Sequence, residues 1–150
     1  MTTFEDISDR FKACLTAGPA SEEMISAAQS QLGVRFPPSY RRFLETYGAA
    51  LCPDIEIAGL FTVRDENEPP LWSDVVTSNL QMHRAARLLS SGLVAISGDG
   101  GDYTYCLDTT SSQLGEECPV VALGPGVDCV LIGENFPDFV VRSFEGRVNF

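Results

Sequence analysis

The chain has 150 residues, of which 44% are hydrophobic and 21% charged, and this length and composition fit one globular domain spanning residues 1–150. The composition excludes a disordered or coiled-coil chain, and the apolar runs are too short for a transmembrane helix. The net charge is −11, and the acidic first residues do not resemble a signal peptide, which predicts a cytoplasmic protein.

The first third of the chain has the apolar spacing of helices. Three helices are predicted, over residues 3–16, 21–33 and 38–48. Thr3 and Ser21 are expected to cap the first two, because their side chains can accept hydrogen bonds from first-turn amides. Gly33 is a typical helix stop, and Pro38 suits the first position of the third helix.

After residue 50 the apolar runs shorten and become typical of strands. Strands are expected at residues 55–57, 60–63, 93–97, 103–108, 120–123 and 127–132. Helices are expected over residues 74–89 and from Phe136 to Phe144, the latter beginning near Glu134 or Asn135. Helices, then strands, then a helix predict an α+β fold with a mixed or antiparallel central sheet flanked by helices.

The charge is distributed unevenly along the chain. Residues 1–50 hold six acids and five bases, whereas residues 51–140 hold fourteen acids and three bases. No Lys or Arg occurs between Arg87 and Arg142. This argues against direct contact with nucleic acid or an anionic membrane, which require cations, and favours a basic protein partner. The alternative is that the acidity serves solubility alone.

The five cysteines are odd in number and form no CxxC pair. Without a secretion signal they are interpreted as reduced thiols, with Cys14 and Cys106 as small core residues. His83 is the single histidine, so neither a zinc site nor any other metal or cofactor is expected. It is interpreted as a surface residue of its helix.

The Gly- and Asp-rich segment 98–102 is the most site-like motif. It lacks the Lys of a phosphate-binding loop and the spacing of a calcium-binding loop, so a hairpin turn between two strands is favoured. The carboxylate pairs Asp99/Asp102 and Glu116/Glu117 would need a defined geometry for acid–base chemistry. No catalytic residue is predicted.

Several segments, in this order and spacing, resemble the SUKH superfamily, which is named partly after a yeast regulator of cell-wall synthesis. They are Leu32-Gly33, Phe36-Pro37-Pro38-Ser39-Tyr40-Arg41-Arg42-Phe43-Leu44, Tyr47-Gly48, Leu93-Val94-Ala95-Ile96, Tyr105-Cys106-Leu107-Asp108, Pro119-Val120-Val121 and Asn135-Phe136-Pro137-Asp138-Phe139. The resemblance covers roughly residues 20–145. Two positions depart from the usual pattern: Gln29 replaces a frequent Glu, and Gly48-Ala49-Ala50 replaces a frequent Asn-Gly-Gly.

The resemblance implies a non-enzymatic binding domain. Bacterial SUKH proteins are typically immunity proteins that bind and neutralise polymorphic toxins, many of them nucleases. The expected function is therefore toxin neutralisation by direct contact with a basic toxin domain. The alternative is an intracellular regulatory or scaffold module like the eukaryotic relatives.

The candidate partner-binding surface consists of the acidic residues of the second half, most of them expected in loops or at strand ends, together with the single tryptophan. These residues are Asp54, Glu56, Asp65, Glu66, Glu68, Trp72, Asp74, Asp99, Asp102, Glu116, Glu117 and Asp128. The sequence leaves open whether Trp72 belongs to the core or to the interface.

Overall fold

The computed structural model describes residues 2–63, 67, 70–85, 92–111 and 116–150. Its elements, in chain order, are α1 (Phe4–Ile7), a 3₁₀ helix (Ser8–Ala13), β1 (Leu15–Thr16), α2 (Glu22–Leu32), α3 (Pro38–Thr46), β2 (Ala50–Leu51), β3 (Glu56–Ile57), α4 (Val75–Arg84), β4 (Leu93–Gly98), β5 (Thr104–Asp108), β6 (Val120–Gly124), β7 (Val127–Gly133) and α5 (Phe136–Phe144). Within the described ranges, no helix combines the length and apolarity needed to cross a membrane.

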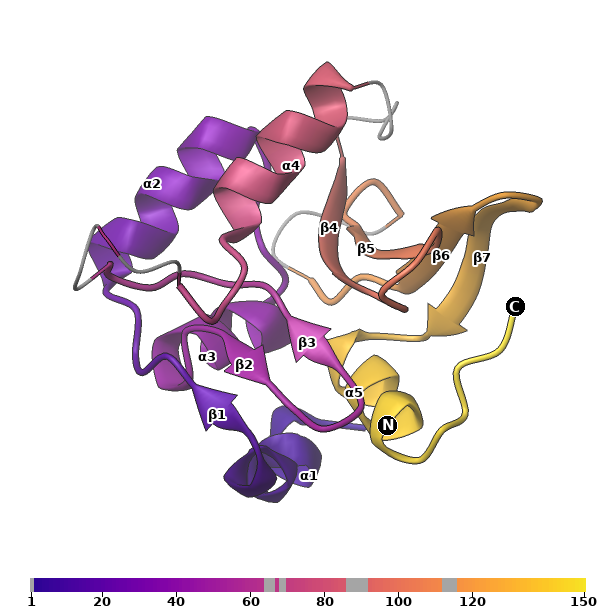
Figure 1. The fold of residues 1–150 in the computed structure, drawn as a ribbon, viewed down its shortest axis with the longest axis horizontal. Coiled ribbons are helices and arrows are strands. Elements are labelled where there is room, and N and C mark those ends of the chain that lie inside the picture. The colour runs from indigo at the N-terminus through magenta and orange to yellow at the C-terminus, as the bar shows by residue number, and fades with distance from the viewer. Residues whose placement is uncertain (1, 64–66, 68–69, 86–91, 112–115) are drawn as a thin grey trace.

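The strands form two antiparallel sheets, which confirms the α+β class (Figure 1). The smaller sheet has the order β1-β2-β3, and the larger has the order β4-β5-β6-β7. The two hairpins expected in the larger sheet, over residues 93–108 and 120–132, are confirmed. The strand expected at residues 60–63 is wrong, because the Leu60 amide donates to the Gly48 carbonyl (2.9 Å) in an isolated contact and not in a ladder.

Local capping signals placed most helix ends correctly. The Ser21 hydroxyl accepts a hydrogen bond from the Met24 amide (3.2 Å), and α2 ends at Gly33, whose φ of 68° is left-handed. The Asn135 side chain accepts one from the Asp138 amide (2.8 Å) at the start of α5.

The helix predicted over residues 3–16 is wrong in its second half. It consists of the short α1 and a 3₁₀ turn that ends at Ala13, after which Cys14 is extended. Leu15 and Thr16 then pair with Leu51 and Ala50 of β2. Pairing with a segment distant in sequence has overridden the local helical spacing.

The cysteine interpretation is also wrong for one pair. Cys14 and Cys52 form a disulfide with Cα atoms 4.3 Å apart, which fastens the end of the 3₁₀ helix to the residue that follows β2. The other three cysteines are free thiols: Cys106 and Cys118 are buried, whereas Cys129 on β7 is exposed. Cys106 is a core residue, as expected, but Cys14 is a crosslink.

The core is organised around Tyr40 of α3, which has no exposed surface. Its ring lies 5.2 Å from Phe36, 5.8 Å from Phe43 and 5.3 Å from Phe136, measured between centroids. Burial raises its pKa, so the hydroxyl stays protonated and donates to the Ala58 carbonyl at 2.6 Å. The Ala58 amide in turn donates to the Ile96 carbonyl of β4 at 2.8 Å. One chain of contacts therefore joins α3, the segment after β3 and the larger sheet.

Asn79 of α4 fixes the position of this helix against β4. Its amide group donates to the Val75 carbonyl (2.7 Å) and the Ala95 carbonyl (2.9 Å), and its oxygen accepts from the Ala95 amide (2.7 Å). Asn79 is 1% exposed, so these bonds satisfy backbone groups that water does not reach.

Gly48 and Gly59 mark a close backbone crossing. Gly48 has a φ of 74°, and a Cβ on Gly59 would lie 1.7 Å from the Gly48 carbonyl oxygen. Any side chain at position 59 would force apart the segments that carry the Tyr40–Ala58 contact.

We therefore expect Gly59→Ala to lower the free energy of unfolding by about 1–3 kcal/mol, the usual cost of overpacking. The matched control is Gly101→Ala, whose Cβ would make an ordinary contact of 3.4 Å with Asp99, and its effect should stay within about 0.5 kcal/mol. Denaturant unfolding of both variants measures the difference. Equal stabilities would contradict the crossing.

The cysteine arrangement predicts a stepwise alkylation pattern that mass spectrometry can count. The folded protein should react first at Cys129, the denatured unreduced protein at the three free thiols, and the reduced protein at all five cysteines. Partial burial and the neighbouring Asp128 raise the pKa of Cys129, so its alkylation at neutral pH should be slower than that of a small-molecule thiol. Five reactive thiols without reductant would refute the disulfide.

Candidate functional site

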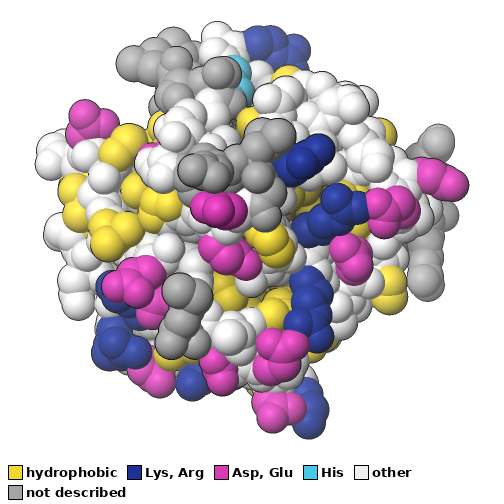
Figure 2. Space-filling view, turned by 180° about the vertical axis from the view of Figure 1, so that it is seen from behind, with side chains coloured by type: hydrophobic (Ala, Val, Ile, Leu, Met, Phe, Trp, Pro, Cys, Tyr) yellow, Lys and Arg dark blue, Asp and Glu magenta, His cyan; other side chains and the backbone are white. Residues whose placement is uncertain are grey.

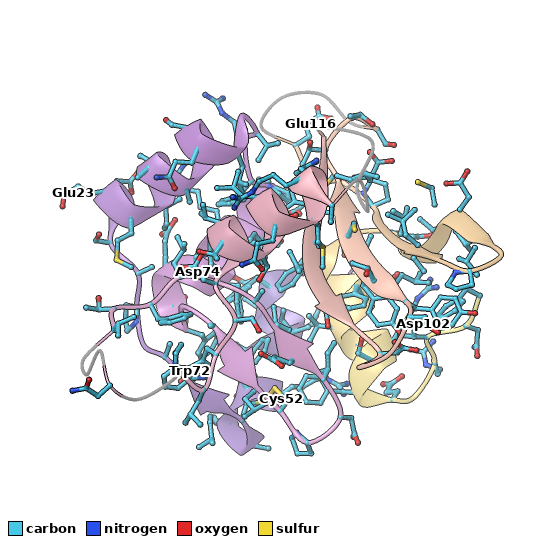
Figure 3. All side chains as sticks on the ribbon, turned by 45° about the horizontal axis from the view of Figure 1, so that its top comes forward. Glu23, Cys52, Trp72, Asp74, Asp102 and Glu116 are labelled. Atoms are coloured by element: carbon cyan, nitrogen blue, oxygen red, sulfur yellow. A yellow bond between two sulfur atoms is a disulfide. The ribbon has the colours of Figure 1, made fainter. Side chains whose placement is uncertain are left out.

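The predicted binding residues do not form a single patch. In Figure 3, Trp72, Glu116 and Asp102 lie at three separate places around the molecule, and Figure 2 shows acidic side chains scattered over the face seen there. The predicted residues Asp65, Glu66 and Glu68 lie outside the described residues. The others separate into carboxylates that the fold uses and carboxylates that remain available.

Three predicted acids, Asp54, Glu56 and Asp99, come together in a cleft of about 480 Å³. The cleft lies between β3, β4, α4 and the β4–β5 hairpin, and apolar side chains such as Ile55 and Ile96 contribute to its lining. The lining residues that the structure describes include no Lys, Arg or His. The cleft therefore offers negative charge beside some apolar lining, which suits a basic side chain with an aliphatic stem.

Glu56 is held in the wall of this cleft by two neighbours. Its carboxylate accepts a hydrogen bond from the Ser73 hydroxyl (2.6 Å), and its backbone carbonyl accepts one from the Ser97 hydroxyl of β4 (2.6 Å). The bond from Ser97 ties β3 to the larger sheet, and the bond from Ser73 ties it to the segment before α4. The wall is thus set before any partner arrives, which limits the entropy lost on binding.

Asp99 shapes the hairpin at the rim of the cleft. One of its oxygens accepts hydrogen bonds from the Gly101 amide (2.8 Å) and the Tyr103 amide (3.2 Å). This confirms the hairpin interpretation of residues 98–102, in which a short Asp side chain replaces a backbone acceptor. Asp102 and Asp54 are both exposed, so their carboxylates reach solvent.

Two of the predicted acids are helix caps. Asp74 accepts hydrogen bonds from the amides of Val76 (2.8 Å) and Thr77 (3.0 Å) at the start of α4. Glu117 accepts from the Ser39 amide (3.0 Å) and the Ser39 hydroxyl (2.5 Å) in the first turn of α3. Sequence reasoning placed both on a binding surface, whereas their carboxylates stabilise helix N-termini.

Trp72 lies at the edge of the fold, half-buried. Its indole N–H donates to the Leu15 carbonyl of β1 (3.2 Å), and its ring centroid is 6.1 Å from that of Phe61. Leu15 and Leu71 beside it are 58% and 61% exposed. Trp72 therefore supports an edge strand with one side and borders exposed apolar residues with the other.

The remaining polar chemistry is limited. Burial raises the pKa of Cys106 and of Cys118 to about 12, which keeps both thiols protonated and unreactive. His83 lies half-buried on α4. No cluster of metal-ligating side chains occurs among the residues that the structure describes.

Sequence reasoning missed Asn79, Ser39 and the Cys14–Cys52 pair. An Asn in the middle of a predicted helix is a weak signal, because its helix propensity is low and it competes for backbone hydrogen bonds. The partners of Ser39 and Cys14 lie 78 and 38 residues away, so no local pattern could have identified them.

The capping role of Glu117 gives a test that separates it from a binding role. Glu117→Ala should lower the free energy of unfolding by about 1–3 kcal/mol, because the buried Ser39 donors lose a charged acceptor. Glu116→Ala, at the exposed neighbouring position, should change it by less than about 0.5 kcal/mol. Thermal unfolding of both variants decides, and a stable Glu117→Ala protein would return this residue to the candidate surface.

Comparison with known families gives one match that covers nearly the whole chain. The family model SUKH_5, described as SMI1-KNR4 cell-wall, matches residues 3–144, and the chain therefore belongs to this family. The resemblance seen in the sequence is confirmed at the level of the superfamily. The Gln29 side-chain oxygen accepts a hydrogen bond from the Phe36 amide at 2.8 Å, so it stabilises the connection that leads into α3.

Proposed function

We propose that this member of the SUKH superfamily is a non-enzymatic immunity protein that neutralises a polymorphic toxin by direct contact. The observation that carries the proposal is the cleft lined by Asp54, Glu56 and Asp99, with no base among its described lining residues. A toxin that acts on nucleic acid carries a positive surface to hold phosphates, and such a surface complements this cleft.

The distribution of charged residues along the chain also supports a basic protein partner. Residues 88–141, which contain β4 to β7, hold eight acids and no Lys or Arg. Opposite fields accelerate the encounter of two proteins, and like charges repel wrong partners. The N-terminal third is nearly neutral in net charge, so the negative charge of the protein comes from residues 51–141.

A second candidate function is an intracellular regulatory or scaffold module. The cell-wall description of the matching family favours it. The neighbouring gene distinguishes the two candidates: a large secreted protein with a C-terminal toxin domain favours immunity, and a cell-wall or signalling gene favours regulation.

A cytoplasmic location is part of the proposal, whereas the Cys14–Cys52 disulfide is more typical of an oxidising compartment. Disulfides persist in oxidising compartments, whereas the cytoplasm keeps most thiols reduced. Alkylation of intact cells followed by mass spectrometry of Cys14 and Cys52 tests this directly. A reduced pair in the cell supports a cytoplasmic protein, and an oxidised pair places it in an oxidising compartment.

The immunity function is tested by co-expression with the toxin domain encoded beside this gene. The wild-type protein should restore growth and bind the toxin in a one-step purification. Catalytically inactive toxin should bind equally well, because the proposal needs contact and not turnover. Growth arrest in the presence of folded protein would overturn the proposal.

The role of the cleft charge is tested by reversing two exposed acids, Asp54 in the cleft lining and Asp102 next to Gly101 in the hairpin at its rim. Asp54→Lys with Asp102→Lys should lower the association rate with the toxin by roughly tenfold at low salt, and the difference should shrink as salt rises. Glu23→Lys, an exposed reversal at the start of α2 far from Asp102 (Figure 3), serves as the control and should have little effect. Stopped-flow rates that are the same for both proteins would refute charge steering by the cleft.

A further inference from the structure

We infer that the outer edge of β7 is a docking site for an extended, basic segment of the protein partner, which adds a strand to the four-stranded sheet. The inference deepens the proposed function, on which it rests, because it states how the same basic partner is held.

The two edges of the four-stranded sheet differ in their backbone hydrogen bonding. At the β4 edge, Asn79 pairs with both backbone groups of Ala95, and the Ala58 amide bonds the Ile96 carbonyl. In the part of the chain that the structure describes, the strand partner of β7 is β6 alone. An unpaired edge exposes backbone donors and acceptors that a further strand can use.

The middle of β7 exposes its side chains. Asp128, Cys129, Val130 and Leu131 are four consecutive exposed residues, with Val130 38% and Leu131 51% exposed. Figure 2 shows hydrophobic side chains gathered at the side of the molecule where Figure 1 places β6 and β7. An added strand would cover apolar surface there as well as backbone.

The register indicates which part of the edge is regular. Val130 pairs with Ala122 and Leu131 with Val121, while the register shifts on either side of this stretch. Cys129 has a φ of 50°, which marks the bulge before Val130. The regular stretch is short, so we expect a modest affinity that acts together with other contacts.

The negative charge around β7 favours a basic strand as the partner of this edge. Exposed Asp128 and Glu134 flank the regular stretch, and the 54 residues from 88 to 141 that contain the sheet carry no Lys or Arg. A second copy of this chain would bring the same negative field and the same bulge, both of which disfavour edge-to-edge pairing. A strand that alternates apolar and basic residues satisfies both the exposed apolar side chains and the carboxylates.

The first experiment uses a short peptide in which valine and lysine alternate, with two variants of that peptide. Hydrogen exchange of the β7 amides should slow on adding the lysine peptide. A peptide with alternate backbone nitrogens methylated should bind about tenfold more weakly, because it cannot donate the hydrogen bonds that pair it with the edge. A valine–glutamate peptide should not bind. Equal binding of the methylated peptide would reduce the effect to charge attraction and overturn strand addition.

The second experiment changes the protein. Leu131→Lys places on the edge a charge of the same sign as the lysines of the peptide, and it should weaken binding of that peptide by about tenfold. Leu80→Lys makes the same change at an exposed leucine of α4 and should leave binding unchanged. Sedimentation of the free protein must show a monomer, because a dimer lost on Leu131→Lys would assign the edge to a second copy.

The two proposals fail in different ways. If Leu131→Lys neutralises the toxin as well as the wild type does, the docking site is wrong and the immunity function stands. If the lysine peptide protects β7 but the protein neither binds nor neutralises the toxin, the docking site stands and the immunity function is wrong.

Discussion

The Tyr40 hydroxyl is the contact on which the rest of the structure depends. It donates to the Ala58 carbonyl, and the Ala58 amide donates to the Ile96 carbonyl of β4. Ala58, which follows β3, therefore joins the aromatic core to the larger sheet. A buried hydroxyl must be paired or it destabilises the fold, and here the pairing also sets the distance between the two halves. The cleft is a consequence, because Ala58 and Ile96 are both among the residues that line it.

The same contacts decide which parts of the larger sheet remain available. Asn79, Ala58 and the Ser97 hydroxyl occupy the backbone at and around β4, and this closes one edge. Growth of the sheet by another strand is then directed to β7. Edge strands are usually protected by charge or bulges, and β7 has a bulge at Cys129 with an acidic surface around it, which discourages self-association without excluding a basic strand.

Net charge alone would have given a misleading view of the acidic residues. Asp74 and Glu117 contribute to the negative field but hold helix ends, and Asp99 holds a hairpin, whereas Asp54 in the cleft lining and Asp102 in the hairpin are exposed. A carboxylate that already accepts two backbone or hydroxyl hydrogen bonds loses stabilising contacts if it turns to a partner. The negative electrostatic field of the protein steers any basic partner. The exposed carboxylates of Asp54 and Asp102 are the ones suited to direct contact with it.

The sequence by itself determined the α+β class, the SUKH membership, the ends of α2 and α5 and the β4–β5 hairpin, because caps, glycine stops and alternation act over a few residues. Only the tertiary structure decided that the 3₁₀ helix after α1 ends at Ala13, since Cys14 is bonded to Cys52 and Leu15 pairs with Leu51. It also decided that Glu117 caps α3 and that Asp54, Glu56 and Asp99 share a cleft. These outcomes depend on which distant segments pack together, and that choice follows from the burial of the whole core around Tyr40, which no local spacing records.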